Sequence, residues 1–199
     1  MKKYLLLITL LYSFSVFAQK AKNDKLSYDD LIEKGVEKDA MEDFEEAVEI
    51  FTEAIELEPM NPVAYDKRAV TYLKLNKYSK ALKDINTAIE KDPTYAVAYN
   101  HRGLTNFYMN KSILALQDFD TAIQLDPKFG RAYFNRALVK LEFGDVEGAY
   151  ADLKKAGSLD YDKAEDTIWK YCADRLFVVP PVLEEPGEDT DSISNDNQE

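Results

Sequence analysis

The chain has 199 residues, with 37 acidic and 25 basic side chains and a formal net charge of −12. This balance excludes a nucleic-acid partner, because phosphate binding needs a basic stripe and the sequence contains none. One histidine and one cysteine cannot supply a zinc site or an intrachain disulfide. The short motifs of nucleophilic, phosphate-binding and metal-dependent enzymes are also missing, so we expect no catalytic residue, no metal and no cofactor.

The N-terminus has the pattern of a secretory signal peptide. Lys2 and Lys3 form a basic start, residues 4–17 are uncharged and mostly apolar, and Val16 and Ala18 are the small residues that signal peptidase prefers. The apolar run is shorter than the ~20 residues that a membrane-spanning helix needs. We therefore expect cleavage after Ala18, export to the periplasm or the outside, and no membrane span after cleavage. Retention of the run as an anchor is the alternative.

Proline recurs along the chain with a fixed period. Pro59, Pro93 and Pro127 are 34 residues apart, and each follows an acidic residue. A period of about 20–50 residues is typical of stacked-repeat proteins, because one unit cannot bury its apolar face alone. We expect four repeats, at residues 28–61, 62–95, 96–129 and 130–161.

Small and large side chains recur in register within these repeats. The eighth, twentieth and twenty-seventh positions hold only Gly or Ala, so two helix backbones can approach each other there. The spacing of Ala47, Phe51 and Ala54 places them on one helical face. Each repeat is therefore predicted to be a pair of amphipathic antiparallel helices. The predicted breaks between paired helices are at residues 76–77, 110–111 and 144–145.

Opposite charges also recur in register. In repeats two, three and four, arginine occupies the seventh position and aspartate the twenty-third, and these positions face each other in a helical hairpin. The predicted pairs are Arg68–Asp84, Arg102–Asp118 and Arg136–Asp152. Because the pairs repeat along the stack, we interpret them as part of the scaffold rather than as a ligand site.

Together these positions resemble the tetratricopeptide repeat (TPR) family, with Tyr65, Tyr99 and Tyr133 at the aromatic fourth position and alanine at positions twenty and twenty-seven. The resemblance covers residues 28–161. It departs from the family at position seven, where arginine replaces leucine, and at Tyr161, where the last repeat loses its proline. The resemblance implies an all-α fold, a right-handed superhelix (solenoid) of stacked antiparallel helix pairs, with a concave groove that binds other proteins.

After the last repeat the chain divides into a helix and an acidic tail. Residues 162–176 have a helical pattern and are expected to cap the repeat stack. Their buried stripe is predicted to be Ile168, Trp169, Cys172 and Leu176. From Pro180 the sequence has seven acidic and no basic residues, so we expect a disordered tail. The domains are then a signal peptide at 1–18, a linker at 19–27, the repeat domain at 28–176 and the tail at 177–199.

The remaining acidity lies in the first repeat. Residues 28–61 contain thirteen acidic residues and two lysines. A basic partner at this end is one interpretation. The other is a solvated outer face that keeps repeat stacks from joining end to end.

In the family, the first helix of each repeat lines the concave groove. The corresponding positions change here from acidic to apolar and aromatic with a few amides, which suits a peptide or helix ligand. The expected peptide-binding groove contains Asp66, Lys67, Asn100, His101, Leu104, Phe107, Tyr108, Arg131, Phe134 and Asn135. The alternative for Val70, Leu104 and Leu138 is ordinary packing between adjacent first helices. The residues with which some family members grip a terminal carboxylate are not matched, so that binding mode is not expected here.

These expectations describe a non-catalytic adaptor that binds a peptide or helix of another envelope or secreted protein in its groove. We expect the chain itself to be a monomer or to self-associate weakly. Two alternatives stay open: a structural, self-assembling component, and an accessory subunit of an envelope enzyme or secretion complex.

Overall fold

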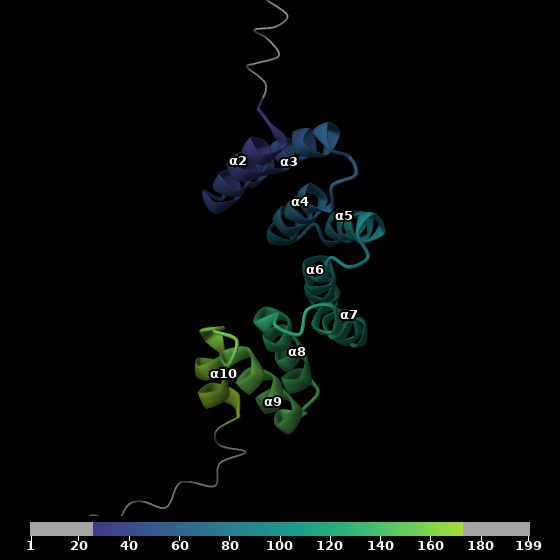
Figure 1. The fold of residues 1–199 in the computed structure, drawn as a ribbon. Coiled ribbons are helices and arrows are strands. Elements are labelled where there is room, and N and C mark those ends of the chain that lie inside the picture. The colour runs from purple at the N-terminus through teal and green to yellow at the C-terminus, as the bar shows by residue number, and fades with distance from the viewer. Residues whose placement is uncertain (1–25, 173–199) are drawn as a thin grey trace, which may run out of the picture.

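The computed structural model describes residues 26–172, which form an arc of stacked helices (Figure 1). Every regular element in this range is an α-helix. The helices are α2 (Tyr28–Ala40), α3 (Phe44–Leu57), α4 (Pro62–Lys74), α5 (Tyr78–Lys91), α6 (Ala96–Tyr108), α7 (Ser112–Leu125), α8 (Gly130–Glu142), α9 (Val146–Gly157) and α10 (Lys163–Tyr171). The expected signal peptide and acidic tail lie outside the described residues.

The helices pair within each repeat and stack between repeats. Each first helix packs against the second helix of its own repeat, and that second helix packs against the first helix of the next repeat. The first helices also contact one another, α2 with α4, α4 with α6 and α6 with α8, along the inner side of the arc (Figure 1). The all-α solenoid predicted from the 34-residue period is confirmed.

Every turn between paired helices contains one residue in the left-handed conformation, always at the fifteenth repeat position. A left-handed residue ends the first helix by letting the next N–H bond back to its last turn. Lys77, for example, donates its N–H to the carbonyl of Tyr72 at 2.8 Å. The left-handed residues are Glu42, Asn76, Asn110 and Gly144, with φ of 65°, 56°, 57° and 78°.

The packing within each repeat depends on one complementary pair at positions eight and twenty-four. A methyl group added at Gly35 would lie 2.4 Å from Cε1 of Phe51, and one added at Gly103 would lie 2.6 Å from Cε1 of Phe119. Glycine therefore makes room for a buried phenyl ring in repeats one and three. In repeats two and four, alanine shares a core cluster with a smaller aliphatic side chain. The pairs are Gly35–Phe51, Ala69–Ile85, Gly103–Phe119 and Ala137–Leu153.

The predicted Arg–Asp pairs are present in repeats two, three and four, and each arginine also makes a second contact that the sequence did not predict. Besides the aspartate of its own repeat, each guanidinium reaches a polar side chain on the second helix of the preceding repeat. The shortest distances to the aspartates are 2.7 Å for Arg68–Asp84, 2.7 Å for Arg102–Asp118 and 2.6 Å for Arg136–Asp152. The partners in the preceding repeat are Thr52, Asn86 and Asp120.

The helix α10 packs against α9 and covers the last repeat. Ala164 and Cys172 are fully buried there, and Ile168 packs against the same cluster. Trp169 is 74% exposed, so the prediction that it belongs to the buried stripe is wrong. Successive helical residues point about 100° apart, so the residue after Ile168 turns away from the cluster that Ala164, Ile168 and Cys172 share with α8 and α9. Leu176 lies outside the described residues.

Candidate functional site

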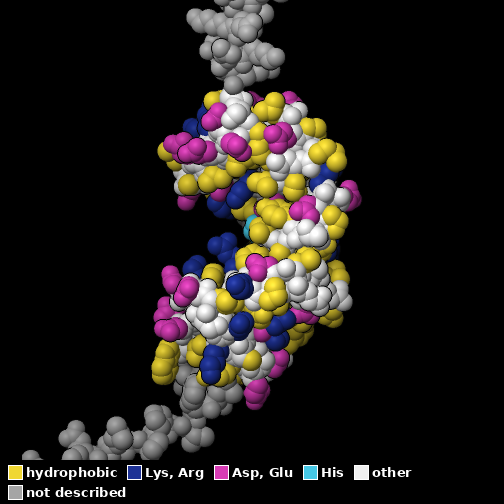
Figure 2. All heavy atoms as spheres, viewed as in Figure 1, with side chains coloured by type: hydrophobic (Ala, Val, Ile, Leu, Met, Phe, Trp, Pro, Cys, Tyr) yellow, Lys and Arg dark blue, Asp and Glu magenta, His cyan; other side chains and the backbone are white. Residues whose placement is uncertain are grey.

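A hollow of about 430 Å³ lies between repeats three and four, bounded by α6, α8 and the start of α10. These helices belong to the inner side of the arc, which Figure 2 shows as a notch with dark blue side chains above and below it. The residues that line the hollow are Leu104, Phe107, Tyr108, Phe119, Arg131, Phe134, Asn135, Leu138, Tyr161 and Lys163.

Aromatic rings form much of the wall. The ring of Phe134 lies 4.9 Å from that of Tyr161, centroid to centroid, at a tilt of 47°. The ring of Tyr108 lies 6.0 Å from Phe107 and is stacked on Tyr78 at 6.1 Å. Tyr108 is nevertheless 56% exposed. Rigid aromatic faces bury a large area at a small entropic cost, so this wall can hold an apolar side chain from a partner.

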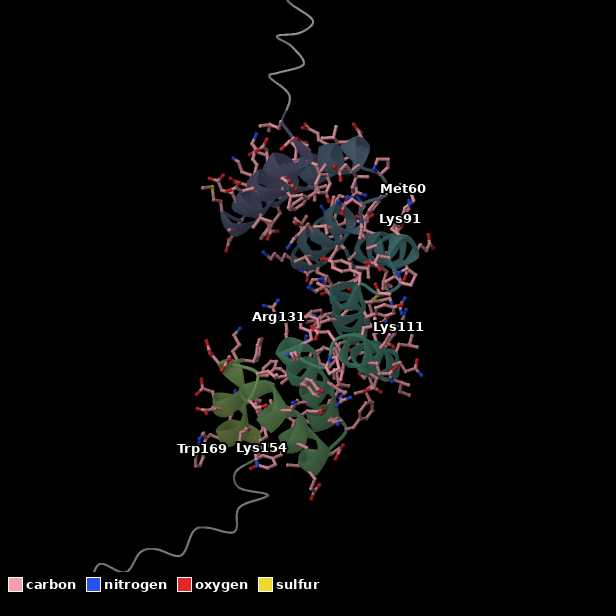
Figure 3. All side chains as sticks on the ribbon, viewed as in Figure 1. Met60, Lys91, Lys111, Arg131, Lys154 and Trp169 are labelled. Atoms are coloured by element: carbon pink, nitrogen blue, oxygen red, sulfur yellow. The ribbon has the colours of Figure 1, made fainter. Side chains whose placement is uncertain are left out.

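Two cations border the hollow. Arg131 stands at the start of α8 and Lys163 at the start of α10, and both are exposed. Within residues 26–172 neither side chain forms an ion pair or hydrogen bond. Arg131 projects from α8 toward the open side of the arc (Figure 3). No Asp or Glu is among the lining residues, so the hollow is positively charged in a chain whose net charge is −12.

The hollow brings together six of the ten residues predicted to form the groove. They are Leu104, Phe107, Tyr108, Arg131, Phe134 and Asn135. Leu138, for which packing was the alternative, also lines it. Phe119 lines the hollow from α7, the second helix of repeat three. Tyr161 and Lys163 follow α9, and the groove prediction covers only the first helix of each repeat. The one signal for them in the sequence is the proline lost at Tyr161.

Two other predicted residues are buried between first helices instead of facing the groove. Asp66 is 1% exposed and Asn100 0%. Nδ1 of His101 lies 2.7 Å from Oδ1 of Asp66, and the Tyr95 hydroxyl donates to the other oxygen at 3.4 Å. Asn135 donates its Nδ2 hydrogen to Oδ1 of Asn100 at 2.8 Å. Asp66 and Asn100 therefore join neighbouring repeats and are not available to a ligand at the surface.

The surroundings of Asp66 keep Tyr95 in its neutral form. Burial raises the pKa of the Tyr95 hydroxyl, and the nearby negative charge of Asp66 raises that pKa further. The hydroxyl thus remains a donor to the carboxylate. Lys67, the last of the predicted residues, is half-buried on α4 and does not line the hollow.

The described residues contain neither a metal-binding cluster nor a membrane-spanning helix. Among residues 26–172, no three or more His, Cys, Asp or Glu side chains are grouped so that they could hold a metal ion. No helix in the same range has both the length and the apolar character needed to cross a membrane.

Stacked helix pairs with an open hollow on the inner face define a helical-repeat scaffold for binding. The sequence pattern of the tetratricopeptide repeat matches residues 31–61 and 62–95. The second TPR domain of human RPAP3, solved in complex with the HSP70 peptide SGPTIEEVD, is 31% identical over 54% of this chain and 90% of its own, with a TM-score of 0.51. The chain belongs to the tetratricopeptide repeat family, whose fold is a protein–protein interaction module.

Two further solved structures are similar in fold. The first TPR of Spaghetti (RPAP3), bound to the HSP90 peptide SRMEEVD, is 28% identical over 57% of this chain and 90% of its own, with a TM-score of 0.54. A thermophilic TPR protein of Thermus thermophilus is 22% identical over 73% of this chain and 81% of its own, with a TM-score of 0.67. No curated protein sequence matches the chain.

Proposed function

We propose that this chain is a non-catalytic adaptor that holds a peptide segment or helix of another exported protein in the hollow between repeats three and four. Its family supports the general role, and two of its structural neighbours were solved with peptides bound. The exported location rests on the signal-peptide pattern of the first 18 residues.

The observation that carries the proposal is an aromatic wall that is open to a partner. Tyr108 is 56% exposed although its ring packs on two other aromatic rings. Concave sites with exposed aromatic anchors and a few polar groups are where protein partners bind most strongly.

Site-specific photo-crosslinking tests the position of the partner. A photoreactive amino acid placed at Tyr108 should crosslink a partner protein in extracts of the native envelope. The matched control places the same group at Ile113, which is 68% exposed and lies outside the hollow. Equal crosslinking of the same partner from both positions would contradict binding in the hollow.

A binding assay needs variants at exposed residues, because truncating a buried side chain also disturbs the fold. Asn100 is fully buried and Phe134 packs against the core, so truncating them also disturbs the fold. Tyr108→Ala with Arg131→Gln changes exposed side chains only, and should abolish capture without lowering the melting temperature. Ile113→Ala with Lys111→Gln is the matched control outside the hollow.

The proposed export has its own test. Expression of the full chain with its native N-terminus in a bacterial host should give a mature protein that starts at Gln19, as read by mass spectrometry. A cytoplasmic protein that retains residue 1 would contradict export and leave the binding proposal to be judged by crosslinking.

A second candidate function, self-assembly, is favoured by one observation. Trp169 and Tyr171 on α10 are 74% and 48% exposed, at the C-terminal end of the repeat stack. Trp is enriched at the centre of contacts between proteins, so the exposed Trp169 ring offers a contact for a second copy. Light scattering decides: a mass that rises with concentration and falls back in Trp169→Ser favours assembly, and a constant monomer mass favours the adaptor.

A further inference from the structure

The hollow carries a charge opposite to that of the whole molecule. Its lining includes two cations and no acidic residue, whereas the chain has a net charge of −12. The arginines at the seventh repeat position are all occupied by aspartates. Arg131 and Lys163 have no such partner among residues 26–172, so their charges remain available to a ligand.

Arg131 and the residues furthest from it in the apolar wall lie at different places along the hollow. The Asn100–Asn135 bond sets the beginning of α6 beside the beginning of α8. Arg131 is therefore at one end, and Phe107 and Leu138 lie further along the two helices. From Arg131 to Leu138 the rise of the helix is about 10 Å, which about three residues of an extended peptide span.

Resting on the proposed function, we infer that the hollow selects a segment with an Asp or Glu side chain about three residues from a large apolar side chain. The carboxylate lies at Arg131 and Lys163, and the apolar side chain packs against Phe107 and Leu138. Electrostatic complementarity of this kind sets partner choice more than raw affinity, so the acidic group acts as the specificity determinant.

The carboxylate comes from a side chain within the segment rather than from a chain terminus. Gripping a terminal carboxylate requires several donors that converge on one point. Here Asn135 donates its Nδ2 hydrogen to Asn100, and His101 is bonded to Asp66. Nδ2 of Asn100 has no partner in the described residues, but Asn100 is fully buried between helices and cannot reach a ligand at the surface. Arg131 and Lys163 remain, on separate helices, and they suit a mobile side-chain carboxylate.

Peptide display on the purified protein tests this chemistry. A random library of short peptides, each fused to its carrier at its C-terminus, offers no free terminal carboxylate. Selection should enrich peptides with an acidic residue about three positions from an aromatic residue or Leu. Synthetic amidated versions should bind about twofold to fivefold more weakly to Arg131→Gln, as expected for a partly exposed ion pair. Lys111→Gln is the control, since Figure 3 places Lys111 on the opposite side of the arc from Arg131.

Reversing the charge of Arg131 tests the preference for acidic peptides separately from binding in the hollow. In Arg131→Glu the selection should shift from acidic toward basic peptides, and a carboxylate near the start of α8 does not destabilise the helix. Peptides that lose binding in Tyr108→Ala but show no acidic preference would overturn the inference and leave the proposed function standing. Peptides insensitive to both Tyr108→Ala and Arg131→Gln would overturn both. Enrichment that requires a free C-terminus, tested with non-amidated peptides, would overturn the side-chain source.

Discussion

Arg136 on α8 donates from Nη1 to Oδ1 of Asp120, on the second helix of the preceding repeat, at 2.7 Å. The same guanidinium donates to both oxygens of Asp152 in its own repeat. These bonds raise the pKa of Arg136 above its ordinary value, with the bond to Asp152 the largest cause. One side chain thus connects three helices, and the planar fork of arginine is what allows it.

Replacing Arg136 with lysine tests this connection. Arg136→Lys keeps the charge but loses the fork, so we expect the free energy of unfolding to fall by about 1–2 kcal/mol. Chemical denaturation measures it. Arg131→Lys is the matched control on the same helix, with an expected change within about 0.5 kcal/mol, because Arg131 has no partner in the described part of the chain. Equal losses in both variants would mean that the charge alone matters.

The effect of Gly35→Ala on stability should change sign with the size of the side chain at position 51. In the wild-type chain, Gly35→Ala should lower the free energy of unfolding by about 1–2 kcal/mol, because the new methyl group strikes the Phe51 ring. In a Phe51→Leu background the same change should instead stabilise by about 0.5–1 kcal/mol, since alanine is the better helix former. Thermal and denaturant melts of the four proteins measure the coupling. Additive effects would show that the two residues do not compete for the same space.

The left-handed turn residues predict opposite responses at equivalent positions. Glu42 adopts φ of 65° with a side chain that disfavours it, so Glu42→Gly should stabilise the protein by about 1 kcal/mol. Gly144 has φ of 78° at the same repeat position, and Gly144→Ala should destabilise by about 1 kcal/mol. Urea denaturation of both single variants measures the shifts. A loss of stability in Glu42→Gly would contradict the assignment of strain to Glu42.

Cys172 reports on the docking of α10. The side chain is fully buried, and burial raises the pKa of its thiol. We expect slow alkylation in the native protein at mildly alkaline pH and fast alkylation after denaturation, because the thiolate is the reactive form. Ala164→Asp, which places a charge in the same buried cluster, should accelerate native-state labelling before the repeats melt. Fast labelling of the unmodified protein would show that α10 is not stably docked.

The repeat architecture could be predicted because each of its determinants recurs along the chain. The Arg68–Asp84 pair follows from the hairpin register, and the structure confirms it. The second contact of each arginine was not predictable, since its partner changes from Thr52 to Asn86 to Asp120. A position that varies in this way shows no sequence pattern, although its geometry repeats along the stack.

The site could be predicted only in part, for a geometric reason. The helical pattern identifies the face of each first helix but not how closely adjacent first helices approach. Asn100 and Phe134 occupy equivalent positions, yet Asn100 is sealed between helices and Phe134 borders the hollow. The hollow opens where the chain passes from Tyr161 into α10 at Lys163, a junction that occurs once in the described residues. Because this junction is not repeated, the periodic sequence pattern could not predict the hollow.

The alternation of Gly–Phe and Ala–aliphatic pairs has a consequence for how repeats can be exchanged. The first helix of repeat one would accept the second helix of repeat three without a steric conflict, but joined to repeat two it would leave a gap beside Ile85. The first helix of repeat two joined to the second helix of repeat three would press a methyl group into Phe119. A crossover between the eighth and twenty-fourth positions of two repeats therefore preserves this packing only when it joins repeats of the same kind, Gly–Phe with Gly–Phe or Ala–aliphatic with Ala–aliphatic.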